Sequence, residues 1–95
     1  GLFRYVCWVY NQNGYDVGRT TANGLWQKSQ HISEAEAKPG DLVFFKGTYD
    51  TPGMSHTGIY LGNGMMVSAG DPIKYANIHS SYWEKYLAGF GRLSK

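Results

Sequence analysis

A single histidine in a predicted β-hairpin is the residue of this chain best suited to chemistry. The run SHTGIYLGNGMMVSAG, residues 55–70, is typical of a strand, a tight Gly-Asn-Gly turn and a second strand. Side chains alternate along a strand, so His56, Gly58 and Tyr60 share one face, which leans polar, and the glycine leaves space above the sheet. An imidazole held rigidly beside open space can act as a general base. The hairpin therefore predicts an active site built around His56.

The usual partner of such a base is an activated thiol, and the sequence contains one cysteine, Cys7. Cys7 falls in the middle of an apolar segment that is predicted to form a buried helix. A thiol in such a place lacks the exposed, electropositive surroundings that generate thiolate, and free cysteine is among the most buried residue types. We therefore expect Cys7 to be an inert core thiol. A lone cysteine also excludes an internal disulfide and a cysteine-based zinc cluster, and no metal or organic cofactor is expected.

Length and composition indicate one small globular domain over residues 1–95. Hydrophobic residues make up 42% of the 95-residue chain and charged residues 17%, which is enough apolar material for one core. The formal net charge of +2 is scattered, without a basic run, so nucleic-acid binding is not expected. No apolar run is long enough to span a bilayer. Eight Tyr, three Trp and four Phe suggest an aromatic surface suited to contact with a polymer.

The patterning places helices first and strands afterwards. Helices are expected over residues 2–12, 19–28 and 80–87, with threonines capping the second and serine the third. Strands are expected at 42–45, in both arms of the hairpin, and at 73–78 and 90–93, whereas 31–38 is expected to be an exposed connector. The run 42–45 is apolar on both faces and should be the central strand. His31 and His79 fall in connectors and are expected to be solvated. This order indicates an α+β fold with N-terminal helices packed on a small antiparallel sheet.

The hairpin turn decides which residue meets the imidazole. A three-residue Gly62-Asn63-Gly64 loop places Ser68 opposite Gly58, on the same face as His56 and diagonal to it. We favour this register because it keeps Val67 on the apolar face. In it, Ser68 is expected to reach the imidazole only weakly, for example through water.

A two-residue turn at Asn63-Gly64 gives a different neighbour. Ser68 then pairs with Ile59, and Asp71 comes opposite His56. A carboxylate there would orient the imidazole and stabilise its protonated form better than a hydroxyl.

Five segments, in order along the chain, resemble the NlpC/P60 family of papain-like cysteine peptidases, which cut peptidoglycan stem peptides. They are GRTTANGL (18–25), KPGDLVFF (38–45), SHTGIYLGNG (55–64), GDPI (70–73) and SSYW (80–83). The last two look like versions found in phage and mobile-element cell-wall hydrolases. Each segment alone is a weak signal, but together they cover nearly the whole chain. The resemblance implies a papain-like α+β fold and a peptidoglycan endopeptidase that uses a Cys-His mechanism.

The resemblance makes His56 the base and Ser68 the third catalytic position, which is usually a histidine. In the family, the nucleophilic cysteine lies in an Asp-Cys-Ser-Gly motif at the start of the first helix, where the helix dipole and the histidine favour thiolate. One alignment makes Gly1 the motif's glycine, so that the cysteine lies upstream and the domain is truncated at its N-terminus. A second places Leu2 at the nucleophile position and implies an inactive enzyme. We favour the first, because Gly1-Leu2-Phe3 continues the motif well.

Tyr60, Arg19 and Trp26 are the expected substrate-binding residues. Aromatic rings stack on sugar and peptide faces, and an arginine can pair with a stem-peptide carboxylate. The expected partner is the peptidoglycan stem peptide. The protein is expected to be a monomer that is secreted or associated with the cell wall.

Two other functions fit the same sequence. A non-catalytic module that binds the wall or a partner protein is favoured by Ser68 and by the missing nucleophile. A papain-like acyltransferase or amidase with another substrate is a more distant alternative, since a fold does not fix its chemistry.

Overall fold

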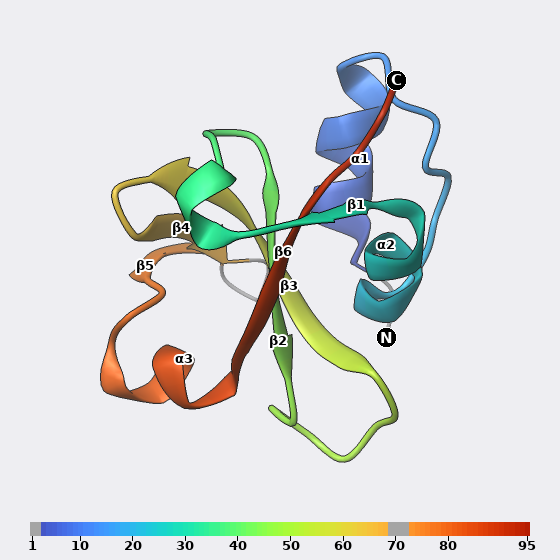
Figure 1. Ribbon diagram of the computed structural model, residues 1–95. Helices are drawn as coiled ribbons and strands as arrows, with labels where there is room; N and C mark the ends of the chain where they lie inside the picture. Colours follow the sequence, from blue (N-terminus) through green and yellow to red (C-terminus); the bar gives the residue numbers. More distant parts are fainter. Residues whose placement is uncertain (1–2, 69–72) are drawn as a thin grey trace.

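The computed structural model describes residues 3–68 and 73–95, which form a few helices and one six-stranded antiparallel sheet (Figure 1). The helices are α1 (Arg4–Gln12), α2 (Ala22–Lys28), the 3-10 helix η1 (Glu34–Glu36) and α3 (Ser81–Tyr86). The strands are β1 (Gln30–Ile32), β2 (Leu42–Lys46), β3 (Met54–Gly62), β4 (Met65–Ser68), β5 (Lys74–Asn77) and β6 (Leu87–Arg92). In the sheet they follow the order β1-β6-β2-β3-β4-β5. The α+β architecture with helices on an antiparallel sheet confirms the sequence prediction.

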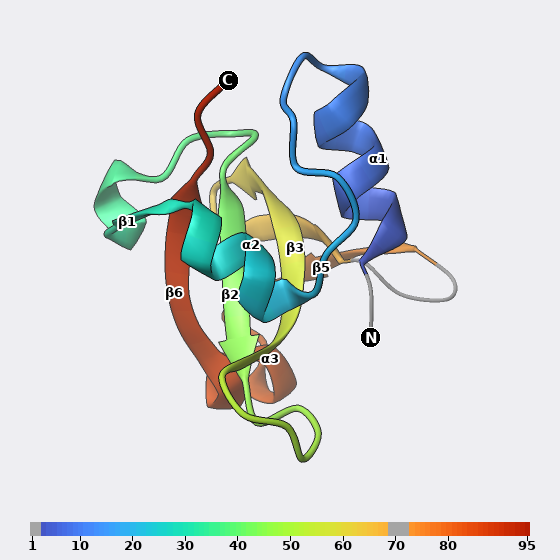
Figure 2. The same cartoon turned by 90° about the vertical axis from the view of Figure 1, so that its right-hand side faces the viewer.

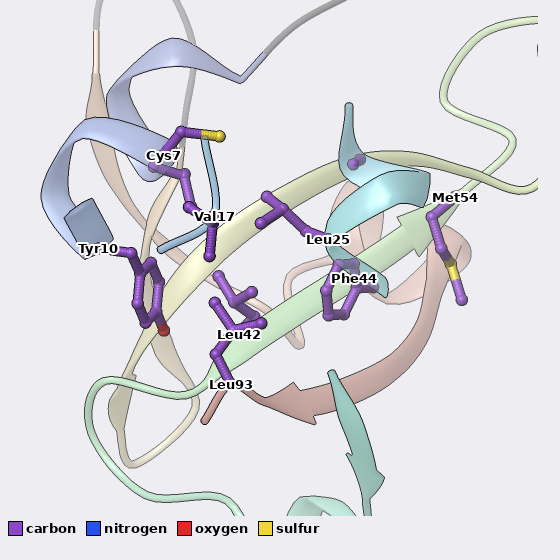
Figure 3. Close-up of a cluster of buried hydrophobic side chains, with 10 residues drawn as sticks. Cys7, Tyr10, Val17, Leu25, Leu42, Phe44, Met54 and Leu93 are labelled. Carbon is purple, nitrogen blue, oxygen red and sulfur yellow. The ribbon is translucent and has the colours of Figure 1, made fainter. Parts of the chain in front are cut away.

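Strand β2 lies inside the sheet and is buried on both faces, as its apolar run predicts. Leu42 and Phe44 belong to a core cluster that α1 and α2 cover, together with Val6, Leu25 and other buried side chains. Figure 2 shows these two helices on the same side of the sheet, and Figure 3 shows the cluster, with Cys7 at its edge. Because successive strand residues point to opposite faces, Val43 and Phe45 face away from these helices.

The opposite face of the sheet carries a second buried cluster. It contains Val43, Phe45, Tyr60, Met66, Ile78 and Phe90, and side chains of α3 and the start of β6 pack against it. This face also holds His56, so the expectation that the face leans polar is wrong. The expected open space above Gly58 is wrong too, because a Cβ on Gly58 would lie 2.7 Å from the sulfur of Met66. The glycine is therefore needed for close packing.

Several element boundaries differ from the prediction for local reasons. Helix α2 begins at Ala22, because Thr21 is extended and its hydroxyl accepts a hydrogen bond from the Gly24 N–H. Ser80 precedes α3 but makes no side-chain cap. The connector at 31–38 contains the short edge strand β1, which pairs with β6, and η1, which is closed by a capping box of Ser33 and Glu36.

The β3–β4 hairpin combines features of both expected turns. Asn63 and Gly64 have φ of 53° and 75°, the positive values that a two-residue hairpin turn requires. The register then shifts between Tyr60 and Gly62, so that Gly58 still pairs with Ser68. The favoured register is confirmed, but a bulge in the strand, and not a three-residue loop, produces it.

Within the described segments, no helix is both long enough and apolar enough to cross a bilayer.

Candidate active site

His56 and Ser68 meet directly on the sheet. The Nε2 atom of His56 lies 3.0 Å from the Ser68 hydroxyl, a hydrogen bond between neighbouring strands β3 and β4. Ser68 is buried and His56 is partly buried. The expectation of a weak contact is therefore wrong: the diagonal arrangement brings the two side chains into direct contact. Asp71, the alternative partner, lies outside the described residues.

Three aromatic rings surround the imidazole. Trp83 of α3 stacks on it with ring centroids 4.9 Å apart, and Phe45 of β2 lies tilted at 5.8 Å. Phe3, which directly precedes α1, meets the imidazole edge-on at 5.3 Å. Together with Ser68 of β4, these rings surround the imidazole with residues from four parts of the chain.

Burial in this aromatic cage lowers the pKa of His56 from 6.5 to about 4, because a charged imidazolium is poorly solvated there. The ring is neutral at pH 7 and carries a lone pair that can accept a proton. A serine hydroxyl can either donate or accept, so Ser68 does not select one tautomer of the imidazole. When Nε2 carries the proton and donates a hydrogen bond to the Ser68 hydroxyl, the free lone pair is on Nδ1. Among the described residues, none makes a hydrogen bond to Nδ1.

The start of α1 lies beside the imidazole of His56. The ring of Phe3 contacts His56, and the Phe3 N–H donates a 3.0 Å hydrogen bond to the carbonyl of Thr20. The chain thus enters its first helix next to the imidazole, which is where a thiol would have to lie to be activated by it.

Cys7 does not occupy that place. Its side chain is 2% exposed, belongs to the core on the other face of the sheet, and directs its thiol toward the carbonyl of Thr20 at 3.9 Å. The prediction that Cys7 is a core residue is confirmed.

The expected substrate-binding residues do not gather around His56. Tyr60 shares the face of His56 but is 5% exposed, and its hydroxyl accepts a hydrogen bond from the Gly64 N–H. Trp26 packs on Phe44, on the face of the sheet opposite His56, and stacks on His31 with ring centroids 3.4 Å apart. Arg19 is exposed and precedes Thr20, so it is the one of the three that lies near the start of α1.

Both other histidines have partners, although they were expected to be merely solvated. Nε2 of His31 lies 2.9 Å from the carbonyl of Trp26. His79 contacts carboxylates of Glu34 and Glu84, at 2.6 and 3.1 Å.

Sequence reasoning did not identify Trp83 and Phe3 as parts of the site. Both stand in segments that carry the family resemblance, SSYW and the start of the first helix, so a signal was available. Their roles could not be assigned because contacts between distant segments are not encoded in local spacing.

Known proteins resemble this chain over most of its length. Residues 3–92 match the model of the NlpC/P60 family. A probable endopeptidase p60 of Listeria monocytogenes is 49% identical over 90 residues, which are 94% of this chain and 18% of the relative. The bifunctional muramidase/DL-endopeptidase CwlT of Bacillus subtilis is 43% identical, over 93% of this chain and 27% of its own length. The chain thus spans less than a third of these relatives.

Solved structures share the fold. A protein of Staphylococcus aureus described as similar to a lipoprotein of the NLP/P60 family superposes with a TM-score of 0.88 at 37% identity, covering 95% of this chain and 30% of that one. RipD of Mycobacterium tuberculosis, described as a non-catalytic NlpC/p60 domain protein adapted to peptidoglycan binding, gives 0.60 at 20% identity, over 78% of this chain and 52% of its own. The latter likeness concerns the fold alone.

Proposed function

This chain belongs to the NlpC/P60 family, and we propose that it is the domain of a peptidoglycan stem-peptide endopeptidase in which His56 is the general base. The observation that carries the proposal is the partly buried imidazole, bonded to Ser68 through Nε2 and placed beside the start of α1. Relatives named p60 endopeptidase and DL-endopeptidase support the same substrate class.

The reaction we propose uses a cysteine thiol that enters the site from the segment preceding α1. Nδ1 of His56 takes the thiol proton, and the sulfur attacks the carbonyl carbon of a stem-peptide amide. Backbone N–H groups at the start of the helix hold the negative oxygen of the tetrahedral intermediate. The imidazolium then gives its proton to the leaving amine as the C–N bond breaks, which leaves the acyl group on sulfur as a thioester. Water, deprotonated by the same imidazole, attacks this thioester and releases the acyl group as a carboxylic acid. The imidazolium finally returns its proton to the thiolate.

Ser68 acts in this proposal as a positioning residue. Its hydroxyl holds Nε2 and so turns Nδ1 toward the start of α1. A hydroxyl stabilises the imidazolium less than a carboxylate or a second imidazole, because it carries no charge and has limited basicity. We propose that the domain works at the cell wall, as a secreted or wall-associated monomer.

A second candidate function is a non-catalytic module that binds peptidoglycan. One observation favours it: Ser68 stands where the family usually has a histidine. Such a module would keep the fold and the surface while lacking hydrolysis.

One comparison separates the two functions. Purified peptidoglycan is incubated with this chain, with a form extended upstream to include the family's cysteine motif, and with the extended form carrying His56→Ala. New stem-peptide ends are measured by mass spectrometry, with His31→Ala as a control for a histidine on the other side of the sheet. Cleavage by the extended form that His56→Ala abolishes and His31→Ala preserves supports the endopeptidase. Binding without cleavage by every form supports the non-catalytic module.

A further inference from the structure

A groove that the proposed chemistry does not use runs along the outer side of α1. It encloses about 380 Å³ between the helix and the segment that leads to α2. The side chains that line it include Arg4, Tyr5, Trp8, Asn11 and Arg19. His56 and Ser68 are not part of its lining, so this hollow is distinct from the candidate active site.

The walls of the groove are held together by hydrogen bonds. The amide of Asn11 donates to the carbonyl of Gly18 at 3.0 Å, and its oxygen accepts the N–H of Val17 at 2.9 Å. Farther along, the Phe3 N–H donates to Thr20. The loop is therefore fixed against α1 at two places, and a ligand would meet a preformed site with little ordering cost.

The lining combines an exposed indole with two unpaired cations. Trp8 is 61% exposed, an unusual state for a tryptophan, and Tyr5 beside it is 37% exposed. Arg4 and Arg19 are exposed and make no ion pair with any residue that the structure describes. Asp16, the acid closest in sequence to Arg19, is exposed and likewise makes no ion pair within the described segments.

This combination defines a class of ligand. A flat indole offers an apolar face to the C–H side of a sugar ring, while its N–H can bond to a hydroxyl. Guanidinium groups bind carboxylates or phosphates through paired hydrogen bonds and disfavour cationic ligands. The groove is therefore complementary in charge and shape to a sugar that carries an acid.

We propose that the groove between α1 and Gly18–Arg19 binds an acidic saccharide, with the sugar ring on Trp8 and the acid beside Arg4 and Arg19. Arg4, which lines the groove, directly follows Phe3, whose ring contacts His56. A wall glycan that binds there through an N-acetylmuramic acid with a free lactyl carboxylate would lie close to the start of α1 and to His56. This last step rests on the proposed endopeptidase function, whereas saccharide binding itself does not.

Binding is tested by NMR with the chain as it is. The probe is the disaccharide of N-acetylglucosamine and N-acetylmuramic acid with a free lactyl carboxylate, and the neutral control is chitobiose. The three indole N–H signals, assigned by substitution, should respond differently: Trp8 shifts and saturates, whereas Trp26 and Trp83 do not. Arg4→Gln should weaken binding about tenfold, as expected for the loss of one charge-assisted contact. Lys28→Gln, an exposed cation on α2, should leave it unchanged.

Three results would overturn the proposal. They are equal binding of chitobiose, a shift of Trp83 in place of Trp8, or stronger binding of a single-stranded oligonucleotide, whose bases also stack on aromatic rings.

A cleavage assay separates this proposal from the endopeptidase proposal. Trp8→Ala in the upstream-extended form should slow cleavage of peptidoglycan in which part of the N-acetylmuramic acid carries a free lactyl carboxylate, and leave cleavage of a sugar-free stem peptide unchanged. If the extended form cuts neither substrate, the endopeptidase proposal fails, but the disaccharide titration still decides whether the groove binds saccharide. If Trp8→Ala cuts both substrates at the normal rate, the groove does not hold the polymer during cleavage.

Discussion

The indole of Trp83 lies against the imidazole of His56, with ring centroids 4.9 Å apart and planes inclined by 28°. Trp83 also packs on Phe45, whose centroid lies 4.7 Å away, so the ring that covers the base is itself fixed by the core of the sheet. Helix α3, which comes more than twenty residues later in the chain, therefore helps to exclude water from the imidazole of His56. Burial, to which this contact contributes together with Phe3 and Phe45, lowers the pKa of His56 to about 4.

Replacing the covering ring should reverse that shift. Trp83→Leu exposes one face of the imidazole to water, so the pKa of His56 should rise from about 4 toward its ordinary value of 6.5. The ring protons of His56 followed by NMR through a pH titration measure the change. Trp26→Leu, which removes the tryptophan stacked on His31, should leave the His56 titration unchanged. A pKa that stays near 4 in Trp83→Leu would show that other groups desolvate the base.

A charge at position 68 should also raise the pKa of His56. Ser68→Asp places a carboxylate within reach of Nε2, and an opposite charge favours the imidazolium by about one pKa unit or more. In the same titration, Ser68→Ala supplies the comparison, because it removes the hydrogen bond without adding charge. The alanine variant should keep the low pKa and lose about 1 kcal/mol of unfolding free energy in urea. If the aspartate variant titrated like the alanine variant, the contact between positions 56 and 68 would not exist in solution.

The central elements of the fold could be predicted from sequence because their signals are local. The apolar run of β2 demands burial on both faces, and Thr21 marks the start of α2. The hairpin register was also predicted correctly, with Val67 paired to Ile59, although both faces of the sheet prove to be apolar. The bulge near Leu61 was not, because a tight turn with a bulged strand gives the same register as a longer turn.

The surroundings of the site were harder to infer for a different reason. Phe3 and Trp83 contact His56 from opposite ends of the chain, and no local sequence pattern predicts contacts over such a separation. Tyr60 was expected to bind substrate because it shares the face of His56, but it is buried within the second cluster. Strand alternation tells which face a residue occupies, and not what covers that face.

The ion pair of Asp41 and Arg92 should support the fold at neutral pH. Asp41 is 7% exposed, and its carboxylate accepts two hydrogen bonds from Arg92, at 3.0 and 2.8 Å, and one from the Lys38 N–H at 2.8 Å. Burial alone would raise the pKa of Asp41, but these bonds outweigh it and lower the pKa. We expect Asp41→Asn to reduce the unfolding free energy by about 2 kcal/mol at neutral pH.

The pH dependence of that loss tests its cause. A lowered pKa in the folded state means that the carboxylate stabilises the fold above its unfolded pKa of about 3.9. This contribution is lost as the pH falls through the lower, folded pKa, so the natural chain and Asp41→Asn should converge in acid. Urea unfolding measured from neutral to acidic pH checks this, with exposed Asp16→Asn as the control. If the difference in unfolding free energy between the natural chain and Asp41→Asn stayed constant with pH, the effect would come from packing and not from the charge.

His79 should show the opposite pH dependence, because it joins two carboxylates on separate elements. Its ring contacts Glu34 of η1 and Glu84 of α3, and hydrogen bonds to the two carboxylates raise its pKa. The stabilisation is therefore complete below the unfolded pKa of about 6.5 and disappears as the pH rises through the folded pKa. Since the group is exposed, His79→Gln should cost at most about 1 kcal/mol, and less at high salt.

Thermal unfolding of His79→Gln and the natural chain, at pH values on both sides of that range and at two salt concentrations, measures the effect. The variant should melt lower in mild acid and at the same temperature in mild base. His31→Gln is the matched control, because His31 bonds a backbone carbonyl and, among the described residues, has no carboxylate partner. A deficit of His79→Gln that persisted in base, or that salt did not reduce, would mean that the ring acts through packing and not through its charge.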